Sequence, residues 1–149
     1  MLTTVQIKEY IPQREPFLMI DEALELSPGA RAVCLKRVRA DEFWTVGHFP
    51  GNPVMPGVLL IEAMAQAGAL CVLSVPENKG RNAFFGGLDQ CKFRDMVKPG
   101  DTLRLEVEIV GLKSRGGKGV ARAYKAAEDG SLPEGAKPVA SCELTFMYG

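Results

Sequence analysis

The longest apolar stretch of the chain runs from Val58 to Val75 and holds only three clearly polar residues, among them Glu62 and Gln66. It follows a Pro56-Gly57 corner, and proline suits the first turn of a helix because its missing N–H has no partner there. A helix that is apolar all round is either buried on every side or crosses a membrane. Because Glu62 and Gln66 would lie well inside the hydrocarbon of a bilayer, the pattern favours a buried helix.

Alternating polar and apolar residues predict strands on both sides of this helix. The segment 103–112 begins LRLEVEIV and has the strictest period of two in the chain, and 31–39 alternates similarly, which indicates a half-buried strand. The other predicted elements are a helix at 3–11 capped by Thr3 or Thr4, and strands at 17–26, 83–93, 119–127 and 139–148. Turns are predicted at 27–30, 99–101 and 114–117, and a loop at 132–138. This order predicts an α+β fold with an antiparallel sheet, formed by a single domain over residues 1–149.

Length, charge and cysteine content narrow the class of protein. The 149 residues include 18 lysines and arginines against 18 aspartates and glutamates, and the sequence pI is about 6.6. A nucleic-acid-binding surface would need a basic excess, so we expect none. Four scattered cysteines and a single histidine argue against a zinc cluster and predict reduced thiols in a cytoplasmic protein. No basic-then-apolar leader precedes the first predicted helix, so we expect no secretion signal.

Candidate chemistry is concentrated in HFPGNPVMPGVLLIEAMAQ, residues 48–66. Histidine titrates nearest physiological pH, which suits His48 as a base. A carboxylate inside an apolar helix is unfavourable unless paired or neutralised, so burial should raise the pKa of Glu62 and suit it to proton transfer. Free N–H groups at the helix start can bind a developing oxyanion. The alternatives are a His48 that is only packed or exposed, and a Glu62 that pairs with an arginine or faces solvent.

The ordered string HFPGxPxMPGVLxxEAxAQ resembles the active-site segment of the beta-hydroxyacyl-acyl carrier protein dehydratases of type II fatty acid synthesis. Two further segments are similar to that family, namely IPQREPFLMID at 11–21 and FFGGLDQCKFRDMVKPGD at 84–101. The resemblance implies a hotdog fold, in which an antiparallel sheet wraps a long central helix. It also implies dehydration of (3R)-hydroxyacyl-acyl carrier protein to trans-2-enoyl-acyl carrier protein in fatty acid biosynthesis.

The implied reaction gives each candidate residue a role. Neutral His48 would take the C2 proton, and Glu62, kept protonated by its apolar helix, would protonate the leaving C3 hydroxyl. The Gly57 N–H would bind the thioester carbonyl as enolate charge develops. Gln66 would orient Glu62, with simple packing as the alternative. No metal or redox cofactor is expected, because the phosphopantetheine arm arrives with the substrate.

An acyl tunnel is expected beside this constellation. The apolar segments 17–20 and 83–85 are the candidates to line it, and Val58 and Phe85 complete the expected substrate-binding set. Gly86-Gly87 interrupts a predicted strand, which often marks a bulge or a close backbone approach. The glycine-rich KSRGGKG at 113–119 lacks the spacing of a phosphate loop and is predicted to be a hairpin turn.

The resemblance implies acyl carrier protein as the partner, and neither a membrane nor a nucleic acid. Lys92, Arg94 and Lys98 form a small basic group that could dock this acidic protein, although most such groups are only solvated. A homodimer with shared sites is also implied, His48 of one subunit facing Glu62 of the other. The larger assembly considered is a hexamer, a trimer of such dimers.

The chain departs from the family pattern at several positions. Gln13 stands where the family commonly has histidine, Glu15 where an aromatic residue is common, and Asp95-Met96 where a basic residue and proline are usual. These departures leave carrier docking and chain-length preference open. Three other functions remain: a hotdog thioesterase, a bifunctional dehydratase-isomerase and a non-catalytic acyl-binding module. The dehydratase-isomerase carries aspartate in place of Glu62 and cysteine in place of Val58, so this sequence favours dehydration alone.

Overall fold

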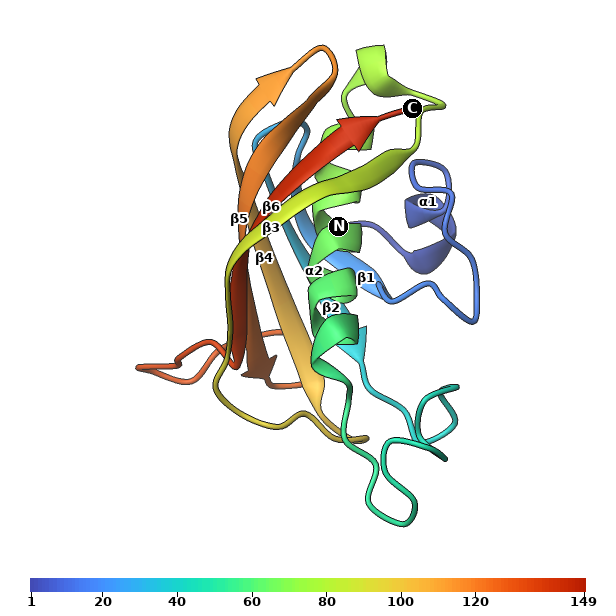
Figure 1. Cartoon of the computed structure of the whole chain (residues 1–149), viewed down its shortest axis with the longest axis vertical. Helices are drawn as coiled ribbons and strands as arrows, with labels where there is room; N and C mark the ends of the chain where they lie inside the picture. The colour runs from blue at the N-terminus through green and yellow to red at the C-terminus, as the bar shows by residue number, and fades with distance from the viewer.

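A computed structural model describes all 149 residues of the chain. Its elements are α1 (Thr4–Ile7), β1 (Glu22–Ser27), β2 (Arg31–Arg37), α2 (Gly57–Leu73), the 3-10 helix η1 (Pro76–Asn78), β3 (Ala83–Phe93), β4 (Thr102–Lys113), β5 (Gly116–Ala126) and β6 (Ala140–Tyr148). The six strands form one antiparallel sheet in the order β1-β2-β4-β5-β6-β3, and Figure 1 shows this sheet curving around α2. The α+β class and the hotdog fold are therefore confirmed.

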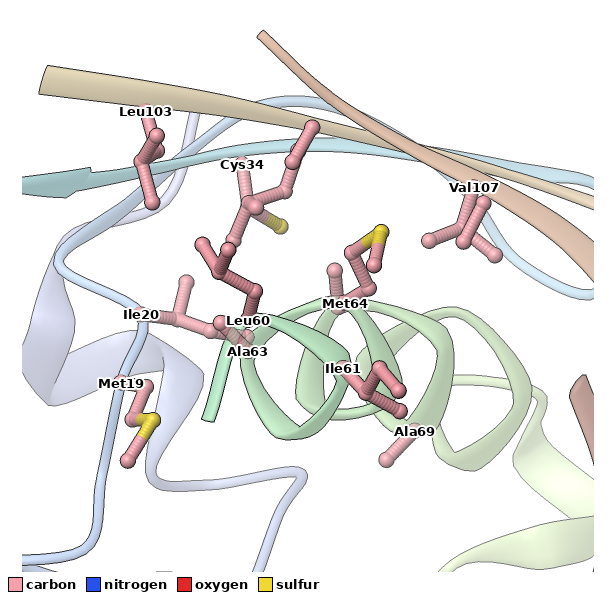
Figure 2. Packing of buried hydrophobic residues seen from close by; sticks show 14 of the residues in the cluster. Met19, Ile20, Cys34, Leu60, Ile61, Ala63, Met64, Ala69, Leu103 and Val107 are labelled. Carbon is pink, nitrogen blue, oxygen red and sulfur yellow. The ribbon is translucent and has the colours of Figure 1, made fainter. Parts of the chain in front are cut away.

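The main core lies between α2 and the concave face of the sheet. Leu60 and Met64 are four residues apart on α2 and are buried, with 2% and 0% of their surface exposed. Figure 2 shows α2 residues lying beneath Cys34 of β2 and Leu103 and Val107 of β4. Burying one side chain of this size contributes about 1.5–3 kcal/mol. This packing holds α2 in place, so the start of the helix lies at a defined end of the sheet.

The predicted strand at 17–26 is wrong in its first half, because β1 begins only at Glu22. The backbone before it is bound by a helix side chain instead. The carbonyl of Phe17 accepts a hydrogen bond from Nε2 of Gln66 at 2.9 Å, and the N–H of Met19 donates to Oε1 of Gln66 at 2.7 Å. The Gln66 amide thus occupies hydrogen-bonding groups that a neighbouring strand would need.

The N-terminal helix is shorter than the predicted 3–11. It covers only Thr4–Ile7, and Thr3 caps it in a capping box with Gln6, so the predicted cap is confirmed. The backbone turns once more after Ile7, with the N–H of Tyr10 donating to the carbonyl of Ile7, before Pro12. An extended amphipathic pattern therefore overestimated the helix by about one turn.

Strand β2 is buried on both faces, not on one as its alternation indicated. All five residues of 32–36 are buried. The connection between β5 and β6 covers the outer face, since a Cβ built on Gly130 would lie only 2.9 Å from the side chain of Leu35. Gly130 has a φ of +88°, which glycine adopts readily, and its carbonyl accepts from Arg104 at 3.1 Å.

The glycine-rich KSRGGKG is a hairpin as predicted, but its turn is shorter than the predicted 114–117, because β5 already begins at Gly116. Residues 114–115 form the turn between β4 and β5, with Lys113 paired to Gly116. The pairing of β3 with β6 shifts register between Phe85 and Gly87, which is the expected bulge.

Two apolar surfaces of the chain are exposed to solvent. Strand β3 lies at the edge of the sheet, and its Phe84, Phe85, Leu88 and Phe93 are between 42% and 53% exposed. The first turn of α2 is open as well, with Val58 73% exposed, so the helix is not buried on every side as its composition predicted. None of the helices has the length and hydropathy needed to cross a membrane.

Candidate active site

His48 lies in the segment between β2 and α2, which projects from the end of the molecule where α2 begins (Figure 1). The chain reverses immediately after it. Phe49 and Asn52 exchange two backbone hydrogen bonds of 3.0 and 2.9 Å, and the N–H of Val54 donates to the carbonyl of His48 at 2.8 Å. The N–H of Met55 then donates to the carbonyl of Val97 at 2.7 Å and ties this reversal to the body of the protein.

The imidazole of His48 has a defined proton position. Its Nδ1 lies 2.7 Å from the carbonyl oxygen of Val54. A carbonyl can only accept, so in the neutral ring Nδ1 carries the proton and Nε2 keeps its lone pair. The ring of Phe49 stacks against the imidazole with 4.0 Å between centroids. The ring is thus held in place with Nε2 free to accept a proton.

The start of α2 supplies free donors. The backbone N–H groups of Gly57 and Val58 donate to no acceptor within the chain, and no side chain caps this end of the helix. The helix dipole makes such a position favourable for negative charge. A Cβ on Gly57 would lie 3.0 Å from the ring of Phe93, so a side chain at this position would require the ring to move away from the helix start. The predicted oxyanion position is therefore available.

Glu62 is held by Gln66 one turn further along α2. Nε2 of Gln66 donates to Oε1 of Glu62 at 3.0 Å and also to the carbonyl of Phe17. Gln66 is completely buried, and its Oε1 accepts from the N–H of Met19, so both ends of its amide are fixed. Gln66 therefore contacts the Glu62 carboxyl directly through a hydrogen bond.

Burial raises the pKa of the Glu62 carboxyl above its ordinary value of 4.5, and the hydrogen bond from Gln66 opposes this only in part. Desolvation disfavours the charged form, since most of the surroundings are apolar side chains. The carboxyl therefore keeps its proton to higher pH than a free glutamate, as an acid working near neutrality requires.

The raised pKa predicts that Glu62→Gln stabilises the fold increasingly as pH rises. Above pH 4.5 the unfolded chain releases this proton while the folded chain retains it, so the folded state binds more protons. The stability contributed by the neutral carboxyl is complete below that pH and is lost as pH rises through the folded-state pKa. Glutamine does not titrate. Thermal unfolding of Glu62→Gln and wild type from pH 4 to 9 should show a growing difference, with Glu9→Gln, at an exposed position, as the control for the loss of a carboxyl. A pH-independent difference for Glu62→Gln would contradict the burial argument.

A cavity of about 200 Å³ opens beside Glu62, bounded by α2 and by strands β3 and β6. Phe85 lines it, as predicted, but His48, Gly57 and Val58 of the same chain do not. The full lining comprises Gln13, Glu62, Ala65, Gly68, Ala69, Ala83, Phe84, Phe85, Leu144 and Phe146. The cavity is thus a largely apolar space with one carboxyl, and the candidate acid and base of a single chain do not share it.

Part of the predicted tunnel lining is wrong. Ala83–Phe85 lines the cavity, whereas none of the residues 17–20 does. Met19 and Ile20 are buried in the core, and Phe17 is 44% exposed. The backbone of this segment is bound by the Gln66 amide, through the carbonyl of Phe17 and the N–H of Met19.

Sequence reasoning missed Gln13 as a site residue, having noted it only as a departure from the family pattern. Its side chain lines the cavity together with Glu62, and its Oε1 is buried without a hydrogen-bond partner. Its place among the proline and charged residues of IPQREPF gave no periodic signal. Only the folding of this segment onto α2 brings it to the cavity.

The three basic residues predicted to dock the carrier protein, Lys92, Arg94 and Lys98, do not all lie together. Lys92 and Arg94 line a shallow depression of about 220 Å³ over β5 and β6, which Arg122 and Glu143 also line and Lys98 does not. Arg94 donates to the hydroxyl of Ser141 at 3.0 Å. The three cations against one carboxylate make this depression positively charged, and Arg122 is a member that sequence spacing could not reveal.

Comparison with known proteins identifies the family to which the chain belongs. A model described as the FabA-like domain matches residues 11–132. A 3-hydroxyacyl-[acyl-carrier-protein] dehydratase FabZ of Enterococcus faecalis is 51% identical, with 99% of each chain covered. One of Halalkalibacterium halodurans is 58% identical over 119 residues, or 80% of this chain and 85% of that one.

A solved structure agrees with the fold. The dehydratase heterocomplex ApeI:P from Xenorhabdus doucetiae matches with a TM-score of 0.75 over 96% of this chain and 90% of that chain. Because the sequence identity is only 16%, this structural similarity supports the fold and nothing further. The family model and the relatives decide the family, and the resemblance seen in residues 48–66 is confirmed: the chain belongs to the FabA-like family and, within it, to the 3-hydroxyacyl-[acyl-carrier-protein] dehydratases FabZ.

Proposed function

We propose that this protein dehydrates (3R)-hydroxyacyl-acyl carrier protein to trans-2-enoyl-acyl carrier protein in fatty acid biosynthesis. The observation that carries the proposal is the carboxyl of Glu62, which has a raised pKa and opens into an apolar cavity. The curated FabZ relatives, about half identical along nearly the whole chain, support the same reaction. Fatty-acid synthesis on a carrier protein also fits a cytoplasmic enzyme, with its four cysteines free.

The proposed chemistry uses one base, one acid and a pair of backbone donors. Nε2 of His48 takes the C2 proton, and the electrons of the broken C–H bond move toward the thioester carbonyl, whose oxygen accepts from the N–H groups of Gly57 and Val58. Glu62 gives its proton to the C3 hydroxyl. The C3–O bond then breaks, water leaves and the C2=C3 double bond forms. His48 returns its proton to solvent and Glu62 regains one, so no metal or redox cofactor takes part.

The proposed enzyme is a homodimer with sites shared between subunits. Three observations support this. The long edge strand β3 carries four half-exposed apolar side chains, which an unpaired edge exposes to another chain. The first turn of α2 is open at Val58. The cavity beside Glu62 lacks His48 of its own chain, so a two-fold partner can supply that ring.

The proposed docking surface for the acidic carrier protein is the basic depression formed by Lys92, Arg94 and Arg122. Lys98 is exposed but does not line this depression, so it is left out of the proposed docking surface. Charge complementarity of this kind raises the rate of encounter more than the final affinity.

One assay separates this proposal from the other functions of the hotdog fold. The protein is incubated with a 3-hydroxyacyl-acyl carrier protein, while enoyl-thioester absorbance and free thiol are followed together. We expect enoyl absorbance without thiol release, and mass analysis of the product should show loss of one water. Thiol release without enoyl absorbance would indicate a thioesterase. A product with its double bond at C3 would indicate a dehydratase-isomerase, and the absence of both signals would indicate a binding module. Each of these results would contradict the proposal.

A further inference from the structure

A buried ion pair lies outside the cavity, where β2 leads into the segment that carries His48. Lys36 is the last residue but one of β2, and its Nζ lies 2.8 Å from Oε1 of Glu42. The two side chains are only 4% and 8% exposed. Replacing a buried ion pair with well-packed apolar residues often leaves the stability of a fold unchanged or higher, because desolvating two charges is unfavourable. The presence of the pair therefore calls for a role besides stability.

Glu42 fixes the backbone on both sides of itself. Its Oε2 accepts from the N–H of Arg39 at 2.7 Å, and the indole Nε1 of Trp44 donates to Oε1 at 3.4 Å. Its own carbonyl accepts from the N–H and the hydroxyl of Thr45, at 3.1 and 2.8 Å. Residues 39–45 belong to no helix or strand, so these bonds replace regular secondary structure in defining the path of the chain.

Trp44 connects this network to His48. Its side chain is 5% exposed and belongs to the main core, and its carbonyl accepts from the N–H of His48 at 3.0 Å. Beyond His48, Val54 binds both the ring and the backbone carbonyl. His48 is thus held by two residues, Trp44 before it in the chain and Val54 after it. The position of the Trp44 carbonyl depends in turn on the hydrogen bond between Trp44 and Glu42.

We propose that Glu42, held by Lys36, is a positioning residue for His48. The ion pair joins the end of β2 to the 39–45 turn, the turn places the carbonyl of Trp44, and that carbonyl fixes the backbone of His48. This role rests on the proposed dehydration, in which Nε2 of His48 must meet the C2 hydrogen. Neither Lys36 nor Glu42 lines the cavity, so both act through His48 and not on the substrate.

The kinetic test uses Glu42→Gln and Lys36→Met, with Arg31→Met as the matched control. Arg31 is a cation on the same strand whose side chain is 33% exposed and pairs with surface glutamates. We expect each network variant to lower kcat about 10- to 100-fold, the effect of a small misplacement of a catalytic group. KM should change little, because the cavity and the helix start are untouched. Arg31→Met should keep the wild-type kcat.

A spectroscopic readout needs no substrate. The chain has a single histidine, so a spectrum of the ¹⁵N-labelled imidazole reports His48 alone. The wild type and Arg31→Met should show the Nδ1-protonated tautomer, whereas Glu42→Gln should show a mixture of tautomers. Because this measurement is independent of turnover, it stays decisive if the wild type fails to dehydrate the substrate, a result that would overturn the proposed function instead.

The double variant Lys36→Met with Glu42→Gln separates positioning from stability. It leaves no unpaired buried charge, so we expect its melting temperature to recover relative to the single variants while kcat stays low. Wild-type kcat and imidazole signals in the folded single or double variants would overturn the inference. Failure of all three variants to fold would assign the pair a purely structural role and overturn it equally.

Discussion

Replacing His48 with alanine is expected to lower kcat for dehydration by about 10²- to 10⁴-fold, the usual contribution of one positioned acid or base. The loss follows because His48 is the only histidine of the chain, so no other imidazole can take the C2 proton. The fold should persist, since the half-buried ring makes its one hydrogen bond to the Val54 carbonyl and lies outside the core between α2 and the sheet. Steady-state kinetics, with circular dichroism as the check on folding, measures the effect.

Glu62→Gln should show a loss of the same order. The amide keeps the size of the side chain and an oxygen that can accept from Gln66, but it cannot give a proton to the C3 hydroxyl. The exposed Glu9→Gln provides the control for a lost carboxyl. Near wild-type turnover by a folded His48→Ala or Glu62→Gln variant would show that the residue concerned has no proton-transfer role.

Mixing two inactive variants is expected to restore activity. If His48 of one subunit works with Glu62 of its partner, a dimer of His48→Ala with Glu62→Ala has one site with both residues and one with neither. Random pairing makes about half of the dimers mixed, so activity should recover to roughly a quarter of wild type. The two variants are unfolded and refolded together, and the recovered rate is compared with that of each variant refolded alone.

The control for this experiment is a chain carrying both substitutions, refolded with the His48→Ala variant. No dimer of that mixture holds a site with both residues, so its activity should stay at the background of the single variants. Lack of recovery in the first mixture, with subunit exchange shown by differently tagged chains, would rule out a shared site. The cavity beside Glu62, from which His48 of the same chain is absent, is the structural reason to expect recovery.

The sequence predicted the strands best where side chains alternate between water and core. Strand β4 was recognised from the alternation of LRLEVEIV, whereas β3 was bounded correctly at Ala83 and Phe93 although its side chains do not alternate in burial. The prediction failed at 17–21, where local β propensity was strong but the backbone was bound by Gln66, some 47–49 residues away in the chain. The β propensity of a segment reflects its own residue types and cannot account for a hydrogen-bond partner far away in the chain.

Within the candidate site, the sequence by itself determined what is local. His48, Gly57, Glu62 and Gln66 lie within 19 consecutive residues, and the α-helical repeat alone puts Glu62 beside Gln66. The apolar composition of the helix likewise determined the direction of the Glu62 pKa shift, because burial disfavours its charge.

Only the tertiary structure decided which distant side chains meet these residues. It brought Gln13 and Phe146 to the cavity, excluded Phe17, and buried Lys36 against Glu42. It also left β3 as an open edge, which the strand's own alternation cannot reveal. The physical reason is that a hydrophobic pattern determines which face of an element is buried, whereas the partners on that face follow from sheet order and packing between segments far apart in the chain.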